Sequence, residues 1–148
     1  MTLQGRWNYQ SFTSFAADVD RTKQPPDVKK PARISGPWTP PSVMEFTTDE
    51  FGKVTGSASL GPIKFNISGL SNPPNKDIPD GIYLVVTVDE AIAQVVTGIK
   101  KDAVYILQGS FLANSDHIVG TVVCISNDLG FQPDGTAGPF VLYPAKSA

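Results

Sequence analysis

Residues 43–59 have the sequence VMEFTTDEFGKVTGSAS, in which two runs of alternating side chains flank Asp49-Glu50-Phe51-Gly52. Alternation of apolar and polar residues with a period of two is typical of a β-strand with one buried face. The glycine that ends the connection supplies the positive φ angle that tight hairpins need. The stretch therefore predicts a β-hairpin whose strands are residues 43–48 and 53–59.

The same kind of short run recurs along the chain, between many of its 13 glycines and 13 prolines. Some of these runs are apolar at nearly every position, as expected of strands that are covered on both faces. Eight or nine short strands at such intervals predict an all-β fold, an antiparallel meander β-barrel, with a two-sheet sandwich as the alternative. Besides the hairpin, the expected strands are residues 3–12, 63–70, 82–88, 91–99, 103–113, 118–125 and 140–143.

Residues 14–41 interrupt this pattern, because they are rich in proline and in lysine or arginine. Proline lacks a backbone donor and has a fixed φ, so no central strand is expected in this segment. Long segments without regular structure commonly serve as lids or binding loops or are disordered. We expect one domain over residues 1–148, with 14–41 as a long loop after the first strand that acts as a lid. Phe15 and Trp38 are expected to pin this loop to the body of the domain.

Charge and hydropathy exclude several classes of partner. The 148-residue chain has a formal net charge of −2, whereas nucleic-acid binding favours a strongly basic face, so no nucleic-acid partner is expected. No apolar stretch approaches the roughly 20 residues of a membrane helix, so no membrane partner is expected. The first residues lack the basic and apolar regions of a secretory signal, and we expect a cytoplasmic location.

The chain contains few residues that carry metal or nucleophile chemistry. With a single histidine, His117, and a single cysteine, Cys124, no metal site is expected. Cys124 lies in an apolar run and is expected to be a buried small hydrophobe. No glycine-rich phosphate-binding motif is present, so no cofactor is expected. If the segment around His117 is extended, Asp116 points to the opposite face and cannot orient the imidazole.

Two short motifs carry a resemblance to a known class of barrels. Gly5-Arg6-Trp7 at the start of the first strand resembles the Gly-x-Trp start of lipocalin and avidin-type (calycin-type) barrels, and residues 52–57 are similar to a hairpin of avidin-like proteins. The resemblance implies a small antiparallel barrel with an internal ligand site, in which the tryptophan closes one end. The chain departs from the avidins at Tyr9, where they carry the polar residue that binds the ureido oxygen of biotin. With Trp7 and Trp38 as the only tryptophans, biotin is not the expected ligand.

Neutral polar and aromatic side chains on otherwise apolar strands are the candidate site residues. Two of them, Gln108 and Ser110, share a strand face that Tyr105 does not share, so the three can line one cavity only if a bulge intervenes. Glu45 and His117 have the acid–base groups that catalysis needs, and the phenol of Tyr9 is a third candidate. The candidate ligand-binding residues are Trp7, Tyr9, Ser11, Trp38, Tyr83, Tyr105, Gln108 and Ser110.

Three functions fit these features. The first is binding of a small, mostly apolar or amphipathic molecule in the barrel, gated by residues 14–41. The second is a cofactor-independent cyclase or isomerase that acts on a small hydrophobic metabolite, with Tyr9, Glu45 or His117 as the acid–base residue. The third is a structural or adaptor module. Because several strands are apolar on both faces, a homo-oligomer, in the simplest case a dimer, is expected to cover the outer face.

Overall fold

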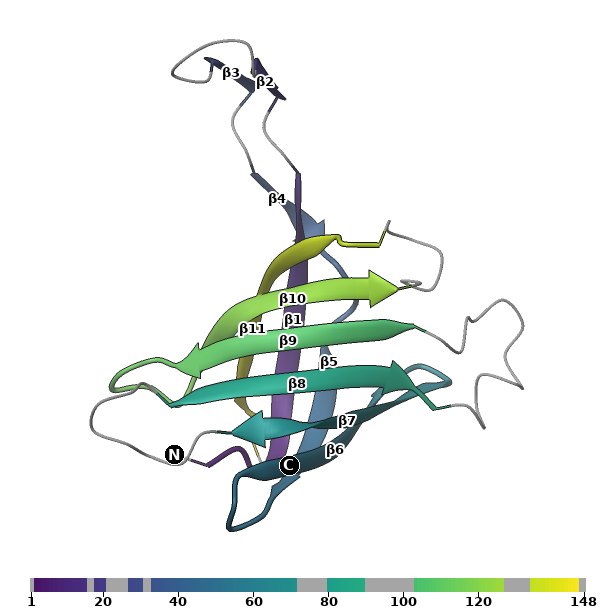
Figure 1. The fold of residues 1–148 in the computed structure, drawn as a ribbon, viewed down its shortest axis with the longest axis vertical. Coiled ribbons are helices and arrows are strands. Elements are labelled where there is room, and N and C mark those ends of the chain that lie inside the picture. Colours follow the sequence, from purple (N-terminus) through teal and green to yellow (C-terminus); the bar gives the residue numbers. More distant parts are fainter. Residues whose placement is uncertain are drawn as a thin grey trace.

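The computed structural model describes residues 2–15, 18–20, 27–30, 33–71, 80–89, 103–126 and 134–146. All the regular secondary structure in these ranges is β-strand (Figure 1). The strands are β1 (Gly5–Phe15), β2 (Asp18–Asp20), β3 (Asp27–Lys30), β4 (Arg33–Pro37), β5 (Ser42–Thr48), β6 (Lys53–Leu60), β7 (Ile63–Ser71), β8 (Gly81–Val88), β9 (Val104–Phe111), β10 (Ile118–Ser126) and β11 (Ala137–Pro144).

Eight of these strands form a closed antiparallel barrel. From β5 to β11 each strand pairs with the next, and β1 pairs with both β5 and β11. The closing register runs from Trp7 opposite Pro144 to Ser11 opposite Phe140. The predicted all-β meander barrel is therefore confirmed, and a closed barrel replaces the sandwich alternative. The strand predicted at residues 91–99 lies outside the described residues.

The β5–β6 connection follows the sequence prediction. Gly52 has a φ of 86°, and its N–H donates to the carbonyl oxygen of Asp49 over 3.1 Å. The Asp49 carboxylate accepts from the backbone N–H groups of Phe51 and Lys53, each at 2.9 Å. The side chain of Asp49 thus takes the place of a backbone acceptor inside the turn, which is a common role of aspartate in tight connections.

Part of the segment 14–41 differs from the expectation of a long loop. The first strand does not end at residue 12 but continues to Phe15, and its last residues pair with β4. β2 and β3 pair with each other, and Figure 1 shows them beyond one end of the barrel. Prolines are tolerated here because β4, among the described strands, pairs only with β1, and Pro37 lies at its end. At the edge of a sheet or at the end of a strand, the backbone N–H that proline lacks would have no partner in the sheet.

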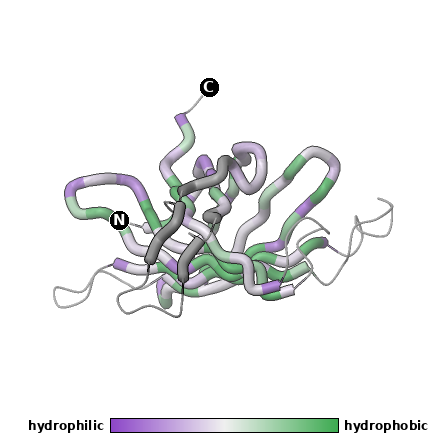
Figure 2. Tube along the Cα trace, turned by 90° about the horizontal axis from the view of Figure 1, so that it is seen from above, coloured by the Kyte–Doolittle hydropathy of each residue, from purple (hydrophilic) through white to green (hydrophobic). Residues whose placement is uncertain are grey.

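The core fills the barrel interior through strict alternation along the strands. In β5, Met44 and Phe46 are buried while Glu45 and Thr47 are exposed. Complete burial of one large aliphatic side chain contributes about 1.5–3 kcal/mol to folding. On β8 both faces are apolar, but the described part of the chain covers only the inward face. The outward side chain of Tyr83 is 44% exposed. Figure 2 shows that hydrophobic residues are concentrated on one side of the barrel wall.

Glycines allow the close approaches that a small barrel requires. Gly109 and Gly120 are opposite each other on β9 and β10, and Gly120 is opposite Phe140 on β11. A β-carbon added at Gly109 would lie 2.9 Å from Cζ of Phe140, so the absence of a side chain makes room for this ring. A β-carbon at Gly138 would overlap the carbonyl oxygen of Phe12, at the point where β11 meets β1.

This contact predicts a large effect of Gly138→Ala. The added methyl group must push β11 away from β1, and we expect a loss of about 2–3 kcal/mol in the free energy of unfolding, as in other overpacked sites. Urea denaturation followed by circular dichroism measures this change. Ala137→Val adds more atoms at the neighbouring exposed position and is expected to stay within about 0.5 kcal/mol of the wild type. Equal stability of Gly138→Ala and the wild type would contradict the close approach.

Candidate functional site

The aromatic side chain nearest the start of β1 fills the barrel rather than lining a hollow. Trp7 is only 2% exposed, and its indole N–H donates to the carbonyl oxygen of Gln4 over 2.9 Å. Its ring meets Phe111 edge to face, with centroids 6.2 Å apart. Trp7 therefore acts as a packed core residue with a satisfied donor. It was also predicted to bind ligand, and it does not line the cavity described next.

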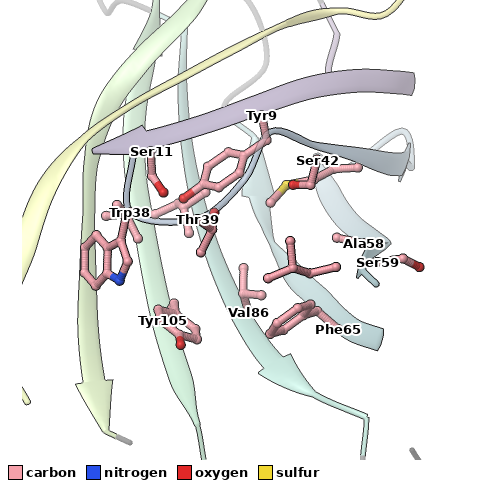
Figure 3. Close-up of a pocket in the computed structure, with 14 residues that line it drawn as sticks. Tyr9, Ser11, Trp38, Thr39, Ser42, Ala58, Ser59, Phe65, Val86 and Tyr105 are labelled. Atoms are coloured by element: carbon pink, nitrogen blue, oxygen red, sulfur yellow. The ribbon is translucent and has the colours of Figure 1, made fainter. Parts of the chain in front are cut away.

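A cavity of about 60 Å³ lies farther along the barrel interior, partly open at its mouth (Figure 3). Seven of the eight barrel strands contribute to its wall, and β11 does not. Its apolar lining comprises Trp38, Met44, Ala58, Leu60, Phe65, Val86, Leu107 and Val122. Its polar lining comprises Tyr9, Ser11, Thr39, Ser42, Ser59 and Tyr105.

Three aromatic rings lie next to one another in the cavity wall. Tyr105 meets Trp38 edge to face with a centroid distance of 6.3 Å, and it meets Phe65 in the same manner at 6.5 Å. Edge-to-face pairs of this kind are worth about 0.5–1.5 kcal/mol beyond their buried area. Trp38 precedes β5 in the chain, and Figure 3 shows it beside the strands that form the opposite wall. A residue from the 14–41 segment is thus part of the cavity.

The backbone at the end of this segment is clamped to β1. The N–H of Trp38 donates to the carbonyl oxygen of Ser11 over 2.8 Å. The side-chain amide of Gln10 donates to the carbonyl oxygens of Ser11 and Thr39, each at 3.1 Å. These bonds hold residues 38 and 39 against the barrel and position the indole. The side chain of Phe15, which was expected to share this role, lies outside the described residues.

The two most enclosed polar side chains of the cavity wall both come from β1. Tyr9 is 7% and Ser11 is 2% exposed, and the Tyr9 ring packs against Phe140 with centroids 6.0 Å apart. Within the described residues every buried side-chain nitrogen or oxygen has a hydrogen-bond partner. A hydroxyl group can both donate and accept a hydrogen bond, so Tyr9 and Ser11 offer a ligand in the cavity two neutral hydrogen-bonding groups.

No residue of the cavity wall carries a formal charge. An unpaired charge buried in such a site would cost several kcal/mol, because nothing replaces its hydration. The wall of the cavity therefore contains no group that could pair with a carboxylate or an ammonium group.

The structure brings some of the predicted ligand-binding residues together and separates the others. Tyr9, Ser11, Trp38 and Tyr105 all line the cavity. The remaining polar candidates lie away from this cavity and are exposed on the outside of the barrel: Tyr83, Gln108 and Ser110. The physical reason is the regular register of β8 with β9, which has no bulge that would turn an outward residue inward.

Two of the three candidate acid–base residues also lie away from the cavity. Glu45 is on the outer face, where its carboxylate Oε1 is 3.5 Å from Nε of Arg6. His117 is exposed after the β9–β10 turn, with Nδ1 2.9 Å from Asp116 Oδ1 and its ring stacked on Tyr143. The segment is a turn and not an extended strand, so the condition under which Asp116 would point away from His117 is not met. Of the three, Tyr9 alone lines the cavity.

Most of the remaining cavity residues had no distinguishing signal in the sequence. Phe65 lines the cavity from β7, whereas Thr39 lies in the link from β4 to β5 and Ser42 is the first residue of β5. Cys124 is fully buried, as predicted.

Neither similarity to known proteins nor a metal site assigns a function to this chain. The chain matches no protein-family model, and no curated protein or solved structure is significantly similar to it. Among the residues that the structure describes, no group of three or more His, Cys, Asp or Glu side chains is placed to hold a metal ion. The same part of the chain contains no helix long and apolar enough to cross a membrane.

The clamp at the cavity mouth predicts a specific role for Gln10. Gln10→Ala removes both amide hydrogen bonds, and we expect a loss of about 1–2 kcal/mol in the free energy of unfolding. Acrylamide quenching of tryptophan fluorescence should also increase, because residues 38 and 39 lose a tether. Asn66→Ala removes a side-chain amide from the exposed outer face of β7 and serves as the matched control, with a change within about 0.5 kcal/mol. Equal effects of the two substitutions would argue against the clamp.

Proposed function

We propose that the protein binds a small, mostly apolar and uncharged molecule in the β-barrel cavity. The observation that carries this proposal is the composition of the wall, in which apolar and aromatic side chains surround a few neutral hydroxyl groups. Binding sites for small molecules usually combine an apolar lining with a small number of polar groups that set the orientation of the ligand. Ser11 and Tyr9 supply such groups from one strand.

The volume of the cavity limits the size of the ligand. One water molecule needs about 10–15 Å³ of comparable space, so 60 Å³ accommodates roughly four to six non-hydrogen atoms. Sites for drug-sized ligands are larger, at about 300–1,000 Å³. The ligand is therefore either a molecule of this small size or a longer one whose inner end occupies the cavity while the rest leaves through the mouth.

Residues 38–41 form the gate in this proposal. Trp38 lies in the cavity wall and belongs to the link that joins β4 to β5. Its position depends on the hydrogen bonds to β1, which can break without disturbing the barrel ladder. Movement of this link would open the mouth and would expose the inner hydroxyl groups.

Binding is favoured over the cyclase or isomerase alternative by the placement of the charged groups. Acid–base catalysis needs a group within hydrogen-bond reach of the reacting atoms. Glu45 and His117 are exposed on the outside, and Tyr9 is the only candidate of the three in the wall.

A series of isosteric probes tests the proposed ligand class. We expect isobutanol to shift the NMR signals of cavity residues with a millimolar Kd, and isobutyrate and isobutylammonium to bind at least about 10-fold more weakly, because neither charge finds a partner. Ala58→Leu fills the cavity and should abolish the response to isobutanol. Ala113→Leu, in the exposed turn after β9, is the matched control and should bind as the wild type does. Preference for either charged probe, or binding that survives Ala58→Leu, would refute the proposal.

The gate is tested separately by Trp38→Ala. Removal of the indole leaves the mouth wider, so we expect the dissociation rate constant koff of isobutanol to rise by about 10-fold or more. NMR line-shape analysis measures this rate. Phe51→Ala removes an aromatic ring that is fully outside the site, in the β5–β6 turn, and should leave the rate unchanged. An unchanged rate in Trp38→Ala would show that ligand leaves by another route.

A further inference from the structure

The outer surface of the barrel has two chemically different sides. None of the strands β8, β9, β10 and β11 contains Asp, Glu, Lys, Arg or His. The outward positions of the other four barrel strands include charged and exposed side chains, namely Arg6, Glu45, Lys53 and Lys64. An uncharged sheet face of four adjacent strands is unusual for a surface in contact with water, and depletion of charge is typical of the centre of a protein interface.

The uncharged side also holds most of the exposed large hydrophobic residues of the described chain. Phe51 and Leu112 lie in turns, and the others point outward from β7, β8, β10 and β11: Leu70, Tyr83, Val119, Ile125 and Tyr143. Soluble monomers rarely expose contiguous apolar patches larger than a few hundred Å².

The cross-strand register arranges these outward residues in continuous rows. One row joins Val85, Ile106 and Val123, all half-buried, across β8, β9 and β10. The next row joins Tyr83, Gln108 and Thr121, all exposed. The second row offers an aromatic ring with a hydroxyl group, an amide and a second hydroxyl group. An apolar row beside a neutral hydrogen-bonding row can be covered without leaving a buried charge.

The area of the face is of the same order as the area that a dimer buries. Four strands about 4.8 Å apart, each about eight residues long at about 3.3 Å per residue, cover roughly 500 Å² of flat sheet, and the corrugated surface is larger. A standard interface buries about 800 Å² on each partner. Leu70, which is opposite Tyr83 in the register, extends the apolar area beyond β8.

We propose that a second copy of this chain covers the outer face of β8–β11, so that two barrels pack sheet against sheet around a two-fold axis. A face without charges offers no electrostatic complement to an acidic or basic partner, whereas it is compatible with itself, because an isologous contact places each patch against its own copy. Face-to-face packing of β-sheets at about 10 Å lets side chains of both faces interdigitate. This contact is separate from the cavity and does not depend on ligand binding.

The test compares two threonines that point outward from opposite sides of the barrel. Thr121 lies at the centre of the uncharged face and Thr55 lies on β6, and both are exposed. Sedimentation velocity of the full chain should give twice the 15.8 kDa mass of the monomer for the wild type and for Thr55→Arg. Thr121→Arg should sediment as a monomer, with self-association at least about 100-fold weaker, because each buried guanidinium would lack a partner.

Gln108→Glu provides a second variant with almost unchanged shape. It adds one negative charge at an exposed position beside Thr121, and it should also give monomers, with a circular dichroism spectrum like that of the wild type. Wild-type protein that stays monomeric at its highest soluble concentration overturns the proposal. A dimer that persists in both Thr121→Arg and Gln108→Glu also overturns it, because the contact must then lie elsewhere.

Discussion

The pairing of β1 with β11 is the constraint on which the rest of the molecule depends. It converts a meander of neighbouring strands into a closed barrel, so that the backbone groups of β1 and β11 bond to each other instead of forming two open edges. The approach is so close that only glycine fits at position 138, opposite the carbonyl oxygen of Phe12. Without this closure the inner faces of the first and last strands would not share one core, and neither Tyr9 nor Ser11 would be enclosed.

The closed barrel is filled unevenly along its length, and the cavity results from this unevenness. An eight-stranded barrel is just wide enough for its side chains to fill it or to leave room for one small ligand. Where Trp7 and Phe111 meet, bulky rings occupy the interior. Farther along, small residues such as Ala58 and Ser42 face the rings of Phe65 and Tyr105, and a hollow remains. Its wall lacks charge because every charged side chain of the barrel strands points outward, where water solvates it.

The inside and the outside of the barrel thus offer two separate surfaces. The proposed ligand site uses inward residues of seven strands together with Trp38, while the proposed dimer contact uses outward residues of β8–β11. Since alternate residues of one strand serve the two surfaces, β9 contributes Tyr105 and Leu107 to the cavity and Ile106 and Gln108 to the outer face. A substitution on one surface can therefore leave the other intact.

The sequence alone determined the fold class, because period-two alternation, glycine-containing turns and runs that are apolar at nearly every position are local properties of the chain. It also singled out Tyr9, Ser11, Trp38 and Tyr105, which the structure unites in one cavity. Only the tertiary structure decided which face of each strand is enclosed where both faces are apolar, and it moved Tyr83, Gln108 and Ser110 to the outside. It likewise decided that part of residues 14–41 pairs as strands and that Glu45 and His117 stay in solvent. The physical reason is that these outcomes depend on register and closure between segments far apart in the chain, which no local pattern encodes.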